Sequence, residues 1–320
     1  MAGGEVAAVL EAAGPKAVEL LARVEVELDR VTSEAQAPLG EFAIQAAGGG
    51  GKRLRPLLAI LAAGPNPVNE KAVVRAGVAV ELVHAATLVH DDILDGSEVR
   101  RGAPTVVASG GRKMAVAVGD WLFAAAFGVL VETGVEDVAL LAAAGSDLAR
   151  GELLQRADAW DLGVTRERYV ERCRLKTARL FQAAAVLGSR AGGISPAGAD
   201  RFASGVGVAF QMLDDVLDVT GPVERTGKPR GTDLLDGTIN LPLIVALDLD
   251  PNLQSVELKS LDETGAAGLC DQIIATGATD QVRAEALALM AEAEERADEL
   301  PGVSGEAFRL VARALVERVA

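Results

Sequence analysis

Apolar residues recur at helical spacing along almost the whole chain, and no stretch shows the alternation of apolar and polar residues that is typical of a strand. Helices are predicted, in chain order, over residues 5–34 with a break at Gly14 and Pro15, ahead of Gly48, and over 56–64, 69–95, 112–133, 137–157, 165–190, 197–219, 239–248, 263–276, 279–299 and 304–319. Because no linker divides the chain, we expect an all-α helical bundle that forms a single domain over residues 1–320.

Composition and net charge restrict the partners that the protein can bind more than they restrict its fold. Half of the residues are apolar and only 3 % are aromatic, which suits closely packed helices. The formal net charge of −15 disfavours nonspecific binding to nucleic acids and to anionic membranes. An anionic substrate must therefore be bound by local basic groups and metal ions, against the overall field of the protein.

The chain also carries hints about its compartment. Cys173 and Cys270 lie far apart without a redox or metal-ligand spacing, so we expect buried thiols of a reduced, cytoplasmic protein. The N-terminus has no basic region before an apolar core, so no signal peptide is expected. Residues 114–131 are the most membrane-like segment, but they contain Asp120 and barely reach spanning length. A buried core helix is the better interpretation, and no transmembrane segment is expected.

The first candidate for chemistry is an acidic cluster at the end of the predicted helix 69–95. Asp91 and Asp95 lie one helical turn apart with Asp92 beside them, and His84 returns to nearly the same face. Two such charges about 4 Å apart repel by roughly 4 kcal/mol, so a cation is expected between them. Oxygen-only ligands favour Mg²⁺, which commonly bridges to substrate phosphates. A solvated acidic helix face is the alternative for this cluster alone.

A second acidic cluster repeats the spacing of the first. Asp214, Asp215 and Asp218 again follow an i, i+1, i+4 pattern, and Gln211 precedes them by one turn. Two such clusters on apolar helices are hard to explain as solvated faces. If they face each other across a cavity, they can bind several Mg²⁺ ions around one diphosphate.

Basic residues occur in two segments that precede or follow these helices. Lys52 and Arg55 follow a run of glycines and open a helix, which is a natural anion site, although a solvated basic turn is the alternative. If the helix ends near Gly96, the chain folds back so that Arg100 and Arg101 reach the carboxylates. These neighbours point in different directions and can serve two different anions, unless they are simply surface arginines.

Two further basic residues lie in the second half of the chain. Lys176 and Thr177 interrupt an apolar stretch, where a single lysine usually extends to solvent. Residues 220–238 are rich in Gly, Pro and Thr and lack apolar periodicity, which predicts a lid loop with Lys228 available to close over an anion. A plain surface loop is the alternative.

Together these motifs resemble those of the trans-isoprenyl diphosphate synthases, the polyprenyl synthetase family. The matching pieces, in the family's order, are GGKRLRP at 50–56, DDILD at 91–95, RRG at 100–102, KT at 176–177, FQMLDDVLD at 210–218 and GK at 227–228. The resemblance implies a helical bundle around a deep central cavity, usually a homodimer. It also implies Mg²⁺-dependent head-to-tail condensation of isopentenyl diphosphate with an allylic diphosphate to an all-trans polyprenyl diphosphate.

The resemblance further implies a role for each matching residue. The ligands of three Mg²⁺ ions would be Asp91, Asp95, Asp214 and Asp218. The residues that bind the allylic diphosphate would be Arg100, Lys176 and Lys228, with Thr177 and Gln211 beside the developing cation. The catalytic group would comprise Lys176, Thr177 and Gln211. The residues that bind isopentenyl diphosphate would be Lys52, Arg55, His84 and Arg101.

Two features of the sequence bear on how the lid binds an anion and on how long the product is. In many relatives a lysine follows the GxDL segment, whereas this chain has Thr238, which weakens the anion site on the lid. Bulk at the fourth and fifth positions before the first aspartate limits product length in the family, and these positions are the small Thr87 and Ala86. They lie roughly 6–8 Å below the metals along a helix. With no aromatic gate there, products longer than C15 are predicted, with Trp121, Phe123 and Phe127 as candidate floors.

Two rival functions remain. A class I terpene cyclase also ionises allylic diphosphates, but it needs no basic isopentenyl site and normally has an NSE-type second metal motif. A noncatalytic regulatory subunit of a heteromeric prenyl synthase is expected to have lost some aspartates, whereas all six remain here.

Overall fold

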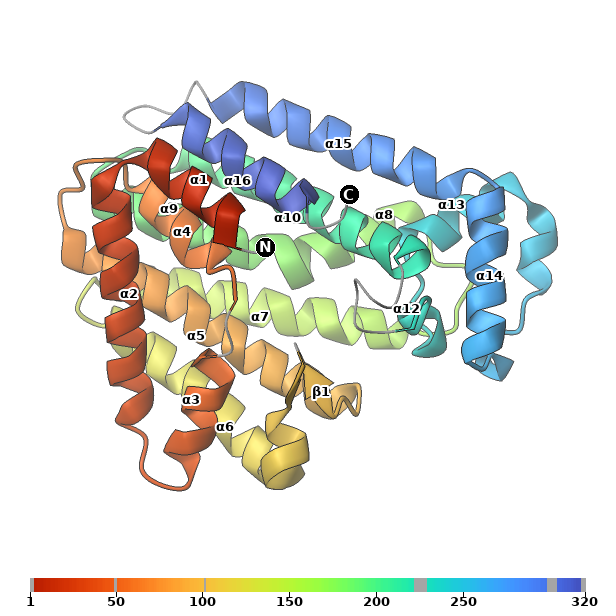
Figure 1. The fold of residues 1–320 in the computed structure, drawn as a ribbon, viewed down its shortest axis with the longest axis horizontal. Coiled ribbons are helices and arrows are strands. Elements are labelled where there is room, and N and C mark those ends of the chain that lie inside the picture. The colour runs from red at the N-terminus through yellow and green to blue at the C-terminus, as the bar shows by residue number, and fades with distance from the viewer. Residues whose placement is uncertain (1–2, 49–50, 101, 222–228, 298–303, 318–320) are drawn as a thin grey trace. The chain divides into compact units, whose positions relative to one another are not determined.

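The computed structural model describes residues 3–48, 51–100, 102–221, 229–297 and 304–317 (Figure 1). The chain divides into two compact units. The first comprises residues 1–145, 180–203 and 296–311, and the second comprises residues 146–179, 204–295 and 312–320.

Helices account for nearly all of the regular structure. In chain order the elements are α1 Gly3–Ala13, α2 Pro15–Ser33, α3 Leu39–Gly48, α4 Leu54–Ala62, α5 Glu70–Leu94, β1 Val99–Arg100, β2 Ala103–Pro104, α6 Val106–Leu130, α7 Val135–Ala157, α8 Arg166–Cys173, the π-helical turn η1 Arg174–Ala178, α9 Arg179–Gly192, α10 Ala197–Thr220, α12 Thr232–Leu235, α13 Leu241–Leu249, the short 3-10 turns η2 Pro251–Ser255 and η3 Leu258–Ser260, α14 Glu263–Ala275, α15 Ala278–Ala297 and α16 Gly305–Glu317. The all-α prediction is confirmed, and the one small exception among the described residues is the antiparallel β1–β2 hairpin.

Helix α5 is the core of the first unit. It is contacted by α2, α3, α4 and α6, and a continuous stretch around Val78–Val83 is almost fully buried. A helix that is apolar on nearly every face is stable only when it is surrounded in this way. The side chain of Asn69 accepts a hydrogen bond from the Ala72 amide at 3.0 Å and so caps the helix start, and Asp95 forms its C-cap. The predicted bounds, 69–95, are confirmed.

Backbones approach closely where glycine allows it. A Cβ on Gly188 of α9 would lie 2.0 Å from the Ala59 carbonyl oxygen, and one on Gly192 would lie 2.2 Å from that of Ala63. Helix α9 therefore packs with its backbone directly against the C-terminal half of α4. This explains how a chain with so few aromatic residues fills its core: small side chains bring helices close together.

The prediction for residues 114–131 was wrong in one respect. Ala115, Leu122 and Leu130 lie on a buried stripe of α6, but Val116 is 42 % exposed and Val131 is 66 % exposed. Among the described residues, α5 and α6 are long and apolar enough to cross a membrane by length and composition, with 83 % and 33 % of the relevant window buried. The α5 window is thus core, whereas α6 buries only one face.

Two predicted helices also differ in detail. Helix α6 begins six residues earlier than expected because Thr105 caps it, accepting a hydrogen bond from the Ala108 amide at 3.1 Å, and Gly111 then interrupts it at φ 79°. The predicted helix 165–190 has the expected extent but contains the five-residue π-helical turn η1. A single π-helical turn inside a long helix shifts the apolar pattern by only one residue, so the pattern over the whole segment still predicts a helix and does not reveal the turn.

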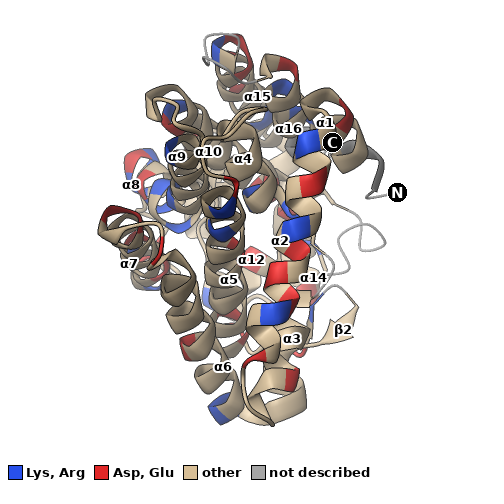
Figure 2. Cartoon of the chain, turned by 90° about the vertical axis from the view of Figure 1, so that its left-hand side faces the viewer, with Lys and Arg blue, Asp and Glu red and all other residues tan. Residues whose placement is uncertain are grey.

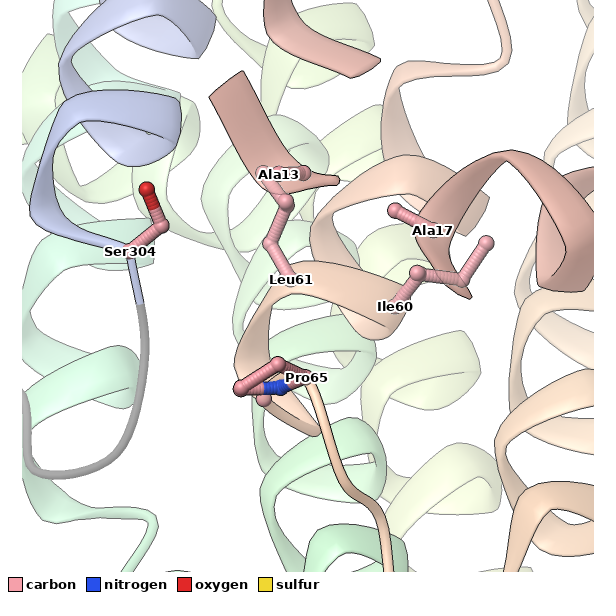
Figure 3. A pocket seen from close by; sticks show the side chains of 7 residues that line it. Ala13, Ala17, Ile60, Leu61, Pro65 and Ser304 are labelled. Atoms are coloured by element: carbon pink, nitrogen blue, oxygen red, sulfur yellow. The ribbon is translucent and has the colours of Figure 1, made fainter. Parts of the chain in front are cut away.

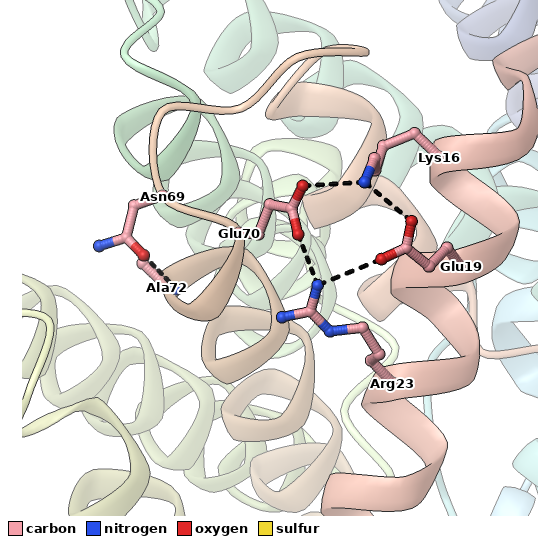
Figure 4. A network of polar contacts seen from close by, with 6 residues as sticks. All are labelled: Lys16, Glu19, Arg23, Asn69, Glu70 and Ala72. Atoms are coloured by element: carbon pink, nitrogen blue, oxygen red, sulfur yellow. Dashed lines mark hydrogen bonds and ion pairs between the residues drawn. The ribbon is translucent and has the colours of Figure 1, made fainter.

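An exposed ion-pair network joins α2 to the start of α5. Glu70 accepts from Lys16 Nζ at 2.9 Å and from Arg23 Nη1 at 2.6 Å, and both basic residues also contact Glu19 (Figure 4). These hydrogen bonds lower the pKa of the Glu70 carboxyl. Figure 2 shows the alternation of acidic and basic residues along α2. Exposed pairs of this kind stabilise a fold only slightly, so the network serves mainly to align the two helices.

The close approach of α9 and α4 generates a stability prediction. Gly188→Ala should lower the free energy of unfolding by about 1–3 kcal/mol, because its methyl group has no space beside the Ala59 carbonyl. Gly268→Ala in α14 is the matched control. It has nothing within 4 Å of the added Cβ and should stabilise the protein by about 0.5–1 kcal/mol. Urea unfolding followed by circular dichroism measures both, and equal effects in the same direction would contradict the packing argument.

Candidate active site

The first acidic cluster lies at the C-terminal end of α5, in the first unit. Asp91 is half-buried and Asp95 is exposed, whereas Asp92 is only 4 % exposed. The Asp95 amide donates to the Asp91 carbonyl at 2.8 Å, so both residues still follow the helical path. The predicted one-turn spacing of Asp91 and Asp95 is therefore confirmed.

The chain folds back after α5 as expected. The β1–β2 hairpin brings Arg100 to Asp92, whose Oδ1 accepts from Arg100 Nε and Nη2, each at 2.8 Å. Asp92 thus positions Arg100 beside the acidic end of the helix. Arg101 lies outside the described residues, so its predicted role stays a prediction.

The basic loop of the same unit leads into α4. Lys52 and Arg55 are both half-buried, and the Arg55 guanidinium lies 4.6 Å from the centroid of the Phe181 ring, a cation–π contact. His84, also half-buried, lies on α5 two turns before Asp91. Lys52, Arg55 and His84 belong to the same unit. Their binding of isopentenyl diphosphate stays a prediction.

The predicted product-length positions are buried on α5. Ala86 is fully buried, and Thr87 is 7 % exposed with its hydroxyl donating to the His84 carbonyl at 2.8 Å. The candidate floor residues Trp121, Phe123 and Phe127 are half-buried on α6. Ala86 and Thr87 are therefore small side chains at buried positions of α5. The role of Trp121, Phe123 and Phe127 as the floor of a product tunnel stays a prediction.

In the second unit, the π-helical turn η1 determines where Lys176 lies. Lys176 Nζ forms an ion pair with Glu152 and donates to Gln155 Oε1 at 3.2 Å, both residues of α7. The turn fits closely between two glycines. A Cβ on Gly151 of α7 would lie 2.6 Å from the Lys176 amide nitrogen, and one on Gly207 of α10 would lie 2.6 Å from Ala178 Cα. Lys176 is therefore held by a carboxylate rather than extended freely to solvent.

Hydrogen bonds connect this turn to α10 and to the start of α13. Thr177 Oγ1 donates to Gln211 Oε1 at 2.9 Å, and Gln211 Nε2 donates to Asp215 Oδ1 at 2.9 Å. The Leu241 amide donates to Asp215 Oδ2 at 3.3 Å. Gln155 Nε2 donates to Thr238 Oγ1 at 3.3 Å. Lys176, Thr177 and Gln211, the predicted catalytic group, thus belong to one unit. Asp215 orients Gln211, which in turn binds Thr177.

The second acidic cluster gains a member that sequence reasoning missed. This member is Asp233. Its backbone amide donates to the Asp218 carboxylate at 3.3 Å, so Asp233 lies beside the end of α10. Burial, and the negative charges of Asp218, Asp215 and Asp214, raise the pKa of Asp233 well above its usual range. Burial also raises the pKa of Asp215, although the hydrogen bond from Gln211 opposes this shift. Nothing in the sequence of the segment GTDLLD, residues 231–236, indicated that Asp233 belongs to this cluster beyond its being acidic.

These carboxyl groups fit a divalent cation. Among the described residues no group of three or more His, Cys, Asp or Glu side chains already converges as a metal site. Mg²⁺ usually takes one or two carboxylates and completes its shell with water and substrate phosphates, so a complete protein cage is not required. Three neighbouring carboxylates add to the effect of burial in raising the pKa of Asp233, a cation would offset their charge, and the donors are all oxygen.

Two other features of the chain add nothing to the site among the described residues. Lys228 lies outside the described residues, so the predicted closure of the lid over an anion stays a prediction. A small pocket near the start of α2 is lined by Ala13, Ala17, Ile60, Leu61, Gly64, Pro65 and Ser304 (Figure 3). Its lining carries no ionisable side chain, so it offers nothing to bind a charged substrate.

Comparisons with known proteins agree with these features. The family model described as Polyprenyl synthetase matches residues 36–275. The chain is 37 % identical to heptaprenyl diphosphate synthase component 2 of Geobacillus stearothermophilus over 82 % of this chain and 83 % of that protein. The crystal structure of a decaprenyl diphosphate synthase from Rhodobacter capsulatus is 30 % identical, with a TM-score of 0.86 over 95 % of this chain and 97 % of that one. A polyprenyl synthase structure from Caulobacter crescentus, complexed with calcium and isoprenyl diphosphate, is 31 % identical with a TM-score of 0.86, over 96 % and 99 % of the two chains.

The raised pKa of Asp233 generates a pH-dependent prediction. Because its folded-state pKa lies above the unfolded value, ionisation of Asp233 costs stability as the pH rises above about 4 and costs nothing below it. Without added metal, Asp233→Asn should therefore raise the melting temperature at pH 7 but not at pH 3. Thermal unfolding of the variant and the parent across this range measures the difference. An exposed carboxylate, removed by Asp280→Asn, should give no such pH-dependent gain, and a gain of equal size there would refute the assignment.

Proposed function

The chain belongs to the polyprenyl synthetase family and is a prenyltransferase, and we propose that it condenses isopentenyl diphosphate head-to-tail with an allylic diphosphate to give an all-trans polyprenyl diphosphate longer than C15. The observation that carries this proposal is the clustering of Asp214, Asp215, Asp218 and Asp233, where burial and the neighbouring negative charges raise the pKa of Asp233 and a bound cation would offset those charges. The first acidic cluster, on α5, and the two basic segments supply the other groups that such a reaction needs.

The proposed roles rest on the placements described above, except those of Arg101 and Lys228, which rest on the sequence motifs alone. Asp91 and Asp95 from the end of α5, and Asp214 and Asp218 from the end of α10, are the proposed Mg²⁺ ligands. The allylic diphosphate is bound by Arg100 and Lys176, with Lys228 as a further proposed ligand. Isopentenyl diphosphate is bound by Lys52, Arg55, His84 and Arg101. The calcium ion and isoprenyl diphosphate named with the Caulobacter crescentus structure support a divalent cation.

The chemistry follows from these groups. Bound Mg²⁺ would offset the charge of the departing diphosphate and so favour ionisation of the allylic C–O bond. Arg100 and Lys176 would bind the same leaving group as its negative charge develops. Thr177 and Gln211, which are hydrogen-bonded to each other with Asp215 orienting Gln211, would line the space beside the allylic carbocation and stabilise it through their oxygen atoms. The isopentenyl double bond then forms the new C–C bond, and the proton that is lost passes to the released diphosphate.

The product length follows from small residues and from relatives. Ala86 and Thr87 put no bulk one turn below Asp91. Relatives are named heptaprenyl and decaprenyl diphosphate synthases, whose products exceed C15. We therefore place the product of this chain in the same range, without choosing one length.

Two alternatives have specific observations against them. A terpene cyclase needs no second diphosphate site, yet the chain has the basic motif with Lys52 and Arg55, and His84 belongs to the same unit. A noncatalytic subunit needs no complete set of ligands, whereas all six aspartates of the two motifs are present. The word component in the name of the Geobacillus stearothermophilus relative nevertheless suggests a second chain for that protein.

We further propose a cytoplasmic homodimer that forms through the exposed face of α6. Val116, Ala117, Ala124 and Gly128 are exposed on α6 and Val131 is exposed directly after it, with the exposed Asp120 as the one charged residue among them. A largely apolar helix face of this length is typical of a protein–protein interface. The cytoplasmic location is supported by the two cysteines, which are buried and free.

The activity is tested by incubating the purified protein with isopentenyl diphosphate, an allylic diphosphate and Mg²⁺, followed by mass analysis. Products longer than C15 are expected, and Ala86→Phe should shorten them because an aromatic ring would occupy the path of the growing chain. Failure of the folded protein to elongate any allylic primer would remove the proposed function. A strict C15 product from the parent protein would remove the inference about length.

The metal ligands are tested by Asp91→Ala and Asp214→Ala. Each should lower kcat by about 10²-fold or more, because the charge of the leaving group is then less well offset. The melting temperature should change little. Asp248→Ala, at an exposed position on α13, is the control and should keep full activity. Normal turnover in either test variant would exclude that residue from the metal site.

The interface is tested by sedimentation of Val116→Arg. A charge on the exposed α6 face should convert the dimer to a monomer, while Val26→Arg on α2, at a position 69 % exposed, should leave the dimer intact. A parent protein that sediments as a monomer, or a Val116→Arg variant that stays dimeric, would contradict the proposed interface.

A further inference from the structure

We propose that Arg53 is a positioning residue that holds the basic loop at residues 51–55 so that Lys52 and Arg55 can bind isopentenyl diphosphate. This inference rests on the proposed function, which assigns Lys52 and Arg55 to that substrate. Arg53 is the third basic residue of the motif GGKRLRP and has no role in the chemistry described above.

The backbone at Arg53 is the first observation. Arg53 has φ 50° and ψ 36°, a left-handed conformation that residues with a Cβ rarely adopt, and it forms the N-cap of α4. Lys52 lies immediately before this reversal, and Arg55 lies in the first turn of the helix after it. The conformation of this single residue therefore sets the relative directions of the two substrate-binding residues. Such a conformation persists only where the surroundings hold it in place.

The contacts of the guanidinium supply that restraint. Arg53 Nε and Nη2 donate to the two oxygens of Glu25 on α2, at 2.8 and 3.1 Å. Arg53 Nη1 donates to Glu81 Oε1 on α5 at 2.8 Å and to the Ala47 carbonyl at the end of α3 at 2.9 Å. One side chain thus fastens the start of α4 to three other helices of the first unit. The planar, forked geometry of arginine is what allows all four hydrogen bonds at once.

The charges divide the three basic residues of the motif into two kinds. The Arg53 side chain is 13 % exposed and faces two carboxylates, so its positive charge is already balanced and it is unsuited to bind a diphosphate. Glu81 is itself 8 % exposed, three residues before His84 on α5. Without Arg53, its buried carboxylate would attract Lys52 or Arg55 and compete with the substrate for them. Arg53 therefore both orders the loop and keeps the substrate-binding cations available.

The test measures both the affinity for isopentenyl diphosphate by calorimetry and the separate KM values for the two substrates. Arg53→Met should weaken binding of isopentenyl diphosphate and raise its KM by about tenfold, which corresponds to about 1.4 kcal/mol. The KM for the allylic diphosphate should change less than twofold. Arg53→Lys keeps the charge but not the fork, so it should restore only part of the affinity.

Two further variants make the result decisive. Glu25→Gln removes the more exposed partner and should be tolerated by the fold. It should raise the KM for isopentenyl diphosphate, whereas it would lower this KM or leave it unchanged if Arg53 itself bound the substrate. Arg23→Met is the matched control, because Arg23 also connects α2 to a glutamate of α5 but lies in the exposed network with Glu70 (Figure 4). It should change neither KM.

The outcomes separate the inference from the proposed function. Binding of isopentenyl diphosphate without turnover in the parent protein would contradict the proposed function, and the calorimetric series would still decide the role of Arg53. Equal affinity in the parent and in Arg53→Met, or equal losses for both substrates, would overturn the positioning role. A parent protein that does not bind isopentenyl diphosphate at all would overturn both.

Discussion

Like-charged carboxyl groups that are gathered in a partly buried place are the constraint on which the rest of this structure depends. At the end of α10, Asp214, Asp215 and Asp218 are joined by Asp233 from the following short helix, and burial together with these neighbouring charges raises the pKa of Asp233. A protein with no use for cations would have little reason to maintain such a cluster. The oxygen-only donors and their incomplete geometry suit Mg²⁺ that arrives with a diphosphate and its own water molecules.

Carboxylates also hold the basic residues of the site in place. Arg100 is bound by Asp92, Lys176 by Glu152, and Arg53 by Glu25 and Glu81. In a chain with a net charge of −15, these pairs orient cations that the overall field would otherwise leave among many competing acids. The paired arginines and lysine thereby differ from the aspartates proposed to bind metal. The acids of the first group hold basic side chains in place, whereas the aspartates of the second group are proposed to bind metal ions.

Much of the fold was predictable from the sequence because its signals were local. The start of α5 follows from the Asn69 cap, and its end follows from Gly96, which has φ 63°. The π-helical turn at Lys176 was not predictable, since one such turn changes the apolar pattern of a long helix very little and its close neighbours Gly151 and Gly207 lie on other helices. The two-residue strands of the hairpin were likewise too short to produce an alternating pattern.

The candidate site was predictable in its residue types but not in the direction of each side chain. Sequence spacing places Asp91 beside Asp92 and Asp214 beside Asp215, and it cannot say which of each pair is buried. In the fold, Asp92 and Asp215 are the buried members, 4 % and 3 % exposed, and they bind Arg100 and Gln211. Asp233 could not be found from spacing at all, because tertiary packing brings it to Asp218 from a polar segment.

The most direct test of the central claim is a crystal structure of the protein with Mn²⁺ and inorganic pyrophosphate, in which anomalous scattering locates the metal. The account predicts Mn²⁺ bound to Asp91 and Asp95, and to Asp214, with pyrophosphate oxygens completing the metal shells. Metal that binds at neither acidic cluster, in crystals where pyrophosphate is bound, would contradict it.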